Sequence, residues 1–199
     1  MYIISRMRYS TEHKKETRER IVRAASRQFR QRGGKGVAIA DLMSKLNLTH
    51  GGFYKHFDSK QELLAEAIAR GFDETEAGFI EAVSKAKPGT ELKMIIKHYL
   101  SLEHCANPAE GCPVAALTSE IVRYPRAVRV EIDRAIQQRM KRLARFLPGT
   151  TEKEREQNCL VLFSGMVGAL NVARAAVDPE SRKRILEASK EFYIKAFCN

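Results

Sequence analysis

The chain has 199 residues, enough to bury a sizeable core in one compact unit or two small ones. Its hydrophobic content of 44% is ordinary for a globular protein, and no apolar run approaches the ~20 residues that a membrane-spanning helix needs. The net charge of +11 is concentrated at one end, because residues 1–62 hold 14 Lys and Arg against 6 Asp and Glu. We therefore expect a cytoplasmic protein with no membrane partner, whose N-terminal part binds a polyanion.

The N-terminal residues predict an arm followed by a helix. Residues 1–10 contain Arg6 and Arg8 but no small-residue cleavage site, so they predict a loose basic arm rather than a signal peptide. Residues 11–32 have apolar residues at helical spacing, and the glycines from Gly33 onwards are typical of a helix end.

The stretch Ile39–Lys60 predicts two short helices joined by a tight turn. Apolar residues from Ile39 to Leu46 recur at helical spacing. Asn47 then tolerates the left-handed conformation that ends a helix, and Thr49 is a good N-cap for the next one. This arrangement is typical of a helix-turn-helix, in which Phe53 and Phe57 would anchor the second helix.

The outward side of the second short helix carries small, polar and basic residues. Such a surface lets a DNA backbone come close while it offers hydrogen-bond donors to phosphates and base edges. The predicted DNA-binding residues are Thr49, His50, Gly51, Gly52, Tyr54, Lys55 and His56.

These residues resemble the signature of the tetracycline-repressor (TetR) family of bacterial regulators. The similarity lies in Asp41-Leu42, in the run from Leu48 to Phe57, and in Ser59-Lys60, and it covers about the first third of the chain. Three departures are Asn47 in place of Gly, His50 in place of Lys, and Val37-Ala38 in place of a capping Thr or Ser. The last departure leaves the cap of the second helix open.

Ser59-Lys60-Gln61-Glu62 predicts a capping box that opens a long helix. Because the N-terminus of a helix is positive, Lys60 beside it could also hold a DNA phosphate, a role that the family resemblance implies. The helix should continue to about Val83 and end before Pro88-Gly89, and so link the DNA-binding part to the remainder.

The rest of the chain predicts five more helices and no strand. The fold is therefore expected to be all-α, with a helix-turn-helix domain at residues 11–60 and a helical effector-binding and dimerisation domain at residues 61–199. The five predicted helices cover residues 91–104, 113–123, 126–147, 151–174 and 179–197.

The last two helices predict a dimer interface. Nearly every residue from Leu160 to Ala173 is apolar, and small residues at Ser164, Gly165 and Gly168 would let another helix pack closely. Burial within one subunit is the alternative. The family resemblance implies a homodimer through these helices, which also suits paired DNA half-sites.

The middle helices are expected to hold a small, apolar effector. The candidate ligand-binding residues are Met94, His98, Tyr99, Phe163 and Met166, each of which could instead be plain core. A metal site at His98, His104, Cys105 and Cys112 fits no known zinc spacing, so no metal or other cofactor is predicted. Cys112 precedes Pro113 at a predicted helix start, where a thiolate is stabilised, and it is a candidate redox sensor. A small buried apolar cysteine is the alternative.

The main hypothesis is a dimeric, sequence-specific repressor that a small molecule releases from operator DNA. One alternative is a regulator that senses oxidants or electrophiles through Cys112. Another is a sequence-independent, architectural DNA-binding protein, which would bind all duplexes alike. The sequence contains no HExxH, GxSxG or phosphate-binding glycine loop, so no enzymatic activity is expected.

Overall fold

A computed structural model describes residues 2–198, with the side chains of residues 11–198 except Ala82. Within this part every regular element is helical, as predicted. The elements are α1 (Tyr2–Arg32), α2 (Ile39–Lys45), α3 (His50–Phe53), α4 (Lys60–Ser84), α5 (Glu91–Tyr99), α6 (Leu102–Ala106), the 3-10 helix η1 (Pro108–Glu110), α7 (Pro113–Ile121), α8 (Arg126–Ala144), α9 (Glu152–Ala175) and α10 (Pro179–Phe197).

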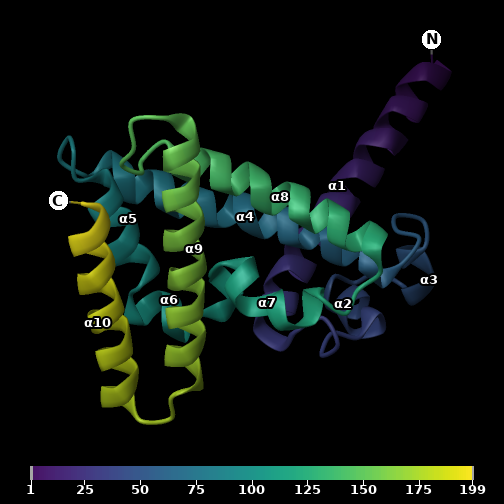
Figure 1. Cartoon of the computed structure of the whole chain (residues 1–199). Coiled ribbons are helices and arrows are strands. Elements are labelled where there is room, and N and C mark those ends of the chain that lie inside the picture. The colour runs from purple at the N-terminus through teal and green to yellow at the C-terminus, as the bar shows by residue number, and fades with distance from the viewer. Residues whose placement is uncertain (1, 199) are drawn as a thin grey trace.

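The N-terminal helix is longer than the sequence suggested. α1 begins at Tyr2, so the expected loose arm at residues 1–10 is wrong for residues 2–10, which extend the helix away from the body (Figure 1). No glycine or proline lies between residues 2 and 32 to stop the helix, which explains the extension. α1 ends as predicted, with Gly33 in the left-handed region at φ 75°.

Helix α4 joins the N-terminal three helices to the remaining bundle. It packs on α1 at one end and on α5 and α8 farther along (Figure 1). Ser59 caps α4 as predicted, because its hydroxyl accepts a 3.1 Å bond from the Glu62 amide. The predicted capping box is incomplete, since the Glu62 carboxylate accepts instead from the Asp58 amide at 2.7 Å.

The predicted helix at residues 91–104 is two helices. α5 ends at Tyr99, and the Ser101 hydroxyl accepts from the His104 amide to cap α6. The His104 ring then binds the Tyr99 carbonyl at 2.7 Å, which satisfies an acceptor that the helix end leaves open. The turn between the helices therefore brings Tyr99 and His104 together.

Helices α9 and α10 pack against each other along the side of the molecule opposite α2 and α3 (Figure 1). Contrary to the expectation from the sequence, α9 is long and apolar enough to cross a membrane by length and composition alone, although six of its side chains are buried in the helical core. Gly165 serves packing within the chain, because a Cβ there would meet the Tyr193 hydroxyl. By contrast, nothing lies within 4 Å of the corresponding position at Gly168.

Candidate nucleic-acid interface and internal cavity

The second short helix, α3, is fixed by buried rings and a side-chain cap. Phe53 and Phe57 are each 1% exposed, and their rings stack with centroids 5.4 Å apart. The Thr49 hydroxyl accepts a 3.2 Å bond from the Gly52 amide, and Asn47 adopts φ 58°. The predicted anchors, N-cap and left-handed turn are thus confirmed. The N-cap residue of α2 is Ala38, and no side chain caps this helix. The Thr or Ser that is usual in the family therefore has no substitute here.

Most of the predicted DNA-binding residues lie on the open side of this helix. Thr49, His50, Gly51, Tyr54 and Lys55 are exposed, while Gly52 and His56 are half-buried. The Tyr54 side chain is 63% exposed although its neighbour Phe53 is buried. A Cβ at Gly51 would meet nothing within 4 Å, which leaves room for a phosphate backbone or a base edge.

Two of the predicted DNA-contact residues, His56 and Lys60, are partly buried and have lowered pKa values. Burial, followed by the charges of Lys14, Arg18 and Lys55, lowers the pKa of His56, so its ring is neutral at pH 7. Lys60 is half-buried at the start of α4 and lines a cleft beside Glu120, and burial lowers its pKa as well. Both side chains are less free to reach a phosphate than the sequence alone suggested.

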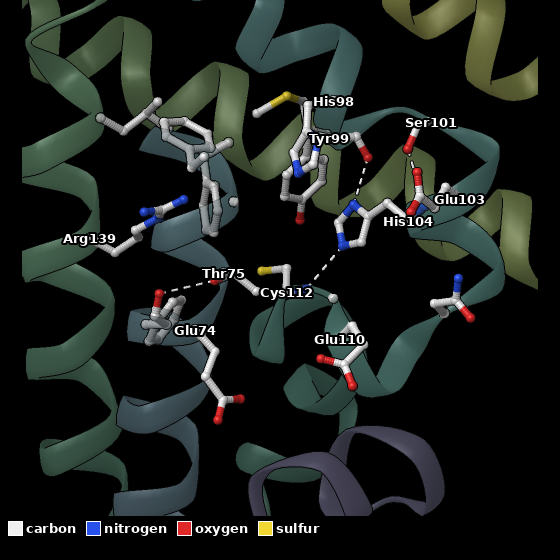
Figure 2. Close-up of a pocket in the computed structure, with 18 residues that line it drawn as sticks. Glu74, Thr75, His98, Tyr99, Ser101, Glu103, His104, Glu110, Cys112 and Arg139 are labelled. Atoms are coloured by element: carbon white, nitrogen blue, oxygen red, sulfur yellow. Dashed lines mark hydrogen bonds between the residues drawn. The ribbon is translucent and has the colours of Figure 1, made fainter. Parts of the chain in front are cut away.

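A cavity of about 250 Å³ lies among α4, α5, α8 and α9 in the C-terminal bundle (Figure 2). Four of the five predicted ligand residues line it: His98, Tyr99, Phe163 and Met166. Met94 does not line it. Cys112 also lines the cavity and is the N-cap residue of α7, as predicted, but its side chain makes no capping bond and it is 5% exposed.

His104 fixes one wall of this cavity. Its Nε2 accepts a 2.9 Å bond from the Cys112 amide, so Nδ1 carries the proton and donates to the Tyr99 carbonyl (Figure 2). Burial lowers the pKa of His104 to about 4. A neutral imidazole therefore ties α6 to the start of α7. Among the described residues, no group of three or more His, Cys, Asp or Glu is placed to hold a metal ion.

The sequence prediction missed Arg139, which lines the cavity although it is only 8% exposed. Its guanidinium lies over the Phe79 ring at 4.4 Å. A signal was present, because Arg139 follows Ile132 by seven residues and precedes Leu143 by four, and so occupies the apolar stripe of α8.

Buried polar bonds connect the cavity with the N-terminal helices. Arg30 in α1 is 3% exposed; it donates to the Gly111 carbonyl at 3.0 Å and pairs with Glu74 of α4 at 2.5 Å. Gly111 and Glu74 both line the cavity. At the far end of α7, the Glu120 carboxylate accepts from the Gly34 amide at 2.9 Å, in the turn between α1 and α2.

The profile described as bacterial regulatory proteins, tetR family, matches residues 21–67, which run from the C-terminal part of α1 through α2 and α3 into the start of α4. This N-terminal segment is similar to the DNA-binding part of the TetR family. It is 36% identical over 69 residues to the HTH-type transcriptional regulator TtgR of Pseudomonas putida, a match that covers 35% of this chain and 32% of TtgR. The chain thus aligns with only about a third of the length of the first curated relatives.

The TetR-like similarity of the fold extends beyond the matched segment. A TetR-family transcriptional regulator from Cytophaga hutchinsonii has a TM-score of 0.74 at 20% identity, over 93% of this chain and 96% of that one. AibR, whose structure contains isovaleryl coenzyme A and operator DNA, has a TM-score of 0.59 at 17% identity, over 88% and 96% of the two chains. At these identities the similarity shows the fold.

Proposed function

We propose that this protein is a cytoplasmic, dimeric transcriptional repressor that binds operator DNA through α3 and releases it when a small molecule fills the cavity. The observation that carries the proposal is the open, capped α3 on a TetR-type N-terminal domain. It presents donors and Gly51 outward while Phe53 and Phe57 hold it from behind. The family consists of regulators, and we assign no catalytic reaction to the chain.

The exposed apolar residues of α9 and α10 support a dimer. Leu160, Val161 and Val172 of α9 are more than half exposed, and Phe192 of α10 is 66% exposed. Burying them against a second copy would remove this apolar surface from water. A dimer of helix-turn-helix domains reads two half-sites about one helical turn apart.

The bonds around Arg30 support a route for release. A ligand that shifts Gly111 or Glu74 would act directly on Arg30 of α1. Because α7 runs from the cavity wall at Cys112 to Glu120, a shift of α7 would also reach the turn at Gly34. The ligand changes DNA affinity only by the difference in its own affinity for the two arrangements.

Selection of bound sequences from a random duplex pool at near-physiological salt tests this proposal. We expect a palindrome with half-sites about one helical turn apart. Retained binding without any common motif would favour the architectural alternative, and absence of binding would contradict a DNA-binding role altogether.

A further inference from the structure

The cavity wall contains two buried side chains, Tyr99 and Arg139, whose donors have no oxygen acceptor at hydrogen-bond distance among the described residues. The Tyr99 residue is 7% exposed, and its hydroxyl has no oxygen or nitrogen partner among the described residues. Burial, followed by the charge of Cys112 and a hydrogen-bonding contact with its sulfur, raises the pKa of Tyr99 well above its ordinary value, so the hydroxyl stays protonated. Because sulfur is a weak acceptor, the hydroxyl keeps most of its donor capacity. A buried donor without a partner is unfavourable, and a ligand acceptor would relieve it.

Arg139 is the second unused donor. Its guanidinium makes no hydrogen bond to any described residue, and its nearest carboxylate, on Glu76, lies 4.0 Å away. That carboxylate pairs more closely with Arg142, at 2.8 Å. The described surroundings therefore leave a buried cation with five N–H groups incompletely neutralised.

Arg139 and Tyr99 line the same cavity. Figure 2 shows Arg139 on one side of the cavity and the Tyr99 hydroxyl pointing into its centre, above Cys112. Arg139 also lies within electrostatic range of Tyr99 and Cys112. One acceptor group of a ligand could thus bind both donors.

The acidic residues of the cavity do not offer a matching negative site. Glu74 pairs with Arg30 at 2.5 Å and with Arg70 at 3.2 Å, and Glu110 pairs with Arg27 at 3.3 Å. Glu103 is exposed at the rim. His98 is also exposed, and His104 is neutral because both of its nitrogens are engaged. The unmatched charge of the buried interior is positive.

The remaining walls define the body of the ligand. Phe72, Phe79, Phe163, Met166 and Leu143 supply buried apolar surface to the cavity. Since a cavity of about 150 Å³ holds benzene, 250 Å³ suits a molecule of about ten non-hydrogen atoms.

We infer that the effector is a small carboxylic acid with an aromatic or alkyl body, whose carboxylate accepts hydrogen bonds from Arg139 and Tyr99. Charge-assisted bonds of this kind are the strong ones, and a guanidinium matches a carboxylate in shape. This inference rests on the proposed function, because it names the chemical class of the molecule that would release DNA.

Calorimetric titration of the full chain with three matched probes tests the inference: 3-phenylpropanoate, 3-phenylpropan-1-ol and 3-phenylpropylammonium. We expect the carboxylate to bind at least about tenfold more tightly than the alcohol, and the ammonium to bind weakest. Equal binding of acid and alcohol, tighter binding of the ammonium, or no binding of the carboxylate would overturn the inference.

Variants locate the binding site. Arg139→Met, which keeps the unbranched apolar stem but removes the guanidinium, should weaken carboxylate binding about tenfold to a hundredfold and change alcohol binding less than about threefold. Tyr99→Phe should weaken carboxylate binding about threefold to tenfold. Unchanged carboxylate affinity in a folded Arg139→Met protein would contradict the assigned binding site. If this variant does not fold, the titration of the wild-type protein with the three probes still tests the chemical class of the ligand.

DNA binding is measured separately on the same protein, so the two ideas can fail independently. If the carboxylate binds through Arg139 but no duplex is bound, the ligand class stands and the regulator proposal fails. If a selected duplex is bound and the carboxylate does not bind, the regulator proposal stands and the ligand class fails.

Discussion

The DNA-binding head (α1–α3) and the cavity-bearing body (α4–α10) use buried groups in opposite ways. In the head, Phe53 and Phe57 fill their space, and Thr49 satisfies the start of α3. In the body, Tyr99 and Arg139 are buried at the cavity wall, and their donors have no oxygen acceptor at hydrogen-bond distance among the described residues. The head is therefore fully packed, whereas the body keeps buried donors at a cavity, which is what the proposed ligand requires.

The largest effect is expected from removing a buried ring of the N-terminal head. Phe53→Ala should destabilise the protein by about 3–5 kcal/mol and abolish DNA binding, because it removes a ring packed behind α3. Tyr54→Ala is the matched control, since that ring is 63% exposed and its loss should change stability by less than about 0.5 kcal/mol. Thermal unfolding and anisotropy with duplex DNA measure both effects; similar losses of stability would contradict the assigned packing.

The second-largest effect is expected for Arg30, which connects the head with the body. Arg30→Met should destabilise the fold by about 3 kcal/mol, because it leaves Glu74 half-neutralised and frees the Gly111 carbonyl. A folded variant should bind DNA but respond less to the cavity ligand. Arg27→Met is the control, because its ion pair with Glu110 is more than half exposed on both sides. An equal ligand response in Arg30→Met and wild type would exclude this route.

Acidification should loosen the cavity wall. The pKa of His104 is lowered to about 4 in the folded protein, while an unfolded histidine titrates near 6.5. Between these values the unfolded chain binds more protons, so the free energy of unfolding falls as pH decreases from about 6.5 to about 4. We expect a loss of about 2 kcal/mol from this residue. Denaturant unfolding from pH 7 to pH 4.5 measures it, and His104→Gln should reduce the slope; the same slope in both proteins would contradict the assignment.

The smallest change separates folding from DNA recognition. Gly51→Ala should stabilise α3 slightly, by up to about 1 kcal/mol, because a Cβ there meets nothing within 4 Å and alanine favours a helix. We expect the added methyl group to weaken DNA binding if a DNA backbone approaches this glycine. Chemical denaturation and duplex titration provide the two readings. Unchanged affinity for DNA would show that the backbone stays farther away.

Local signals explain why the head was predictable. The turn at Asn47, the cap at Thr49 and the anchors Phe53 and Phe57 lie within eleven residues of one another, and each acts on its immediate neighbours. The start of α1 was missed because the basic residues among residues 2–10 were interpreted as a loose arm. No helix-breaking residue separates them from the helix that follows.

The body could be predicted only in part, because its cavity depends on contacts between distant residues. Periodicity found four of the lining residues, but it also selected Met94, which the cavity does not include. Arg139 was overlooked although it lies on an apolar stripe. The split between α5 and α6 depends on His104 turning back to Tyr99, an interaction that spacing alone does not reveal.

The most direct test of sequence-specific DNA binding is the ratio of two affinities at about 150 mM salt: that for a duplex recovered from the pool, and that for the same duplex with both half-sites scrambled. If the open face of α3 reads sequence, the recovered duplex should bind at least about a thousandfold more tightly. A ratio near one, with both affinities falling steeply as salt rises, would contradict sequence reading by α3 and identify a sequence-independent DNA binder.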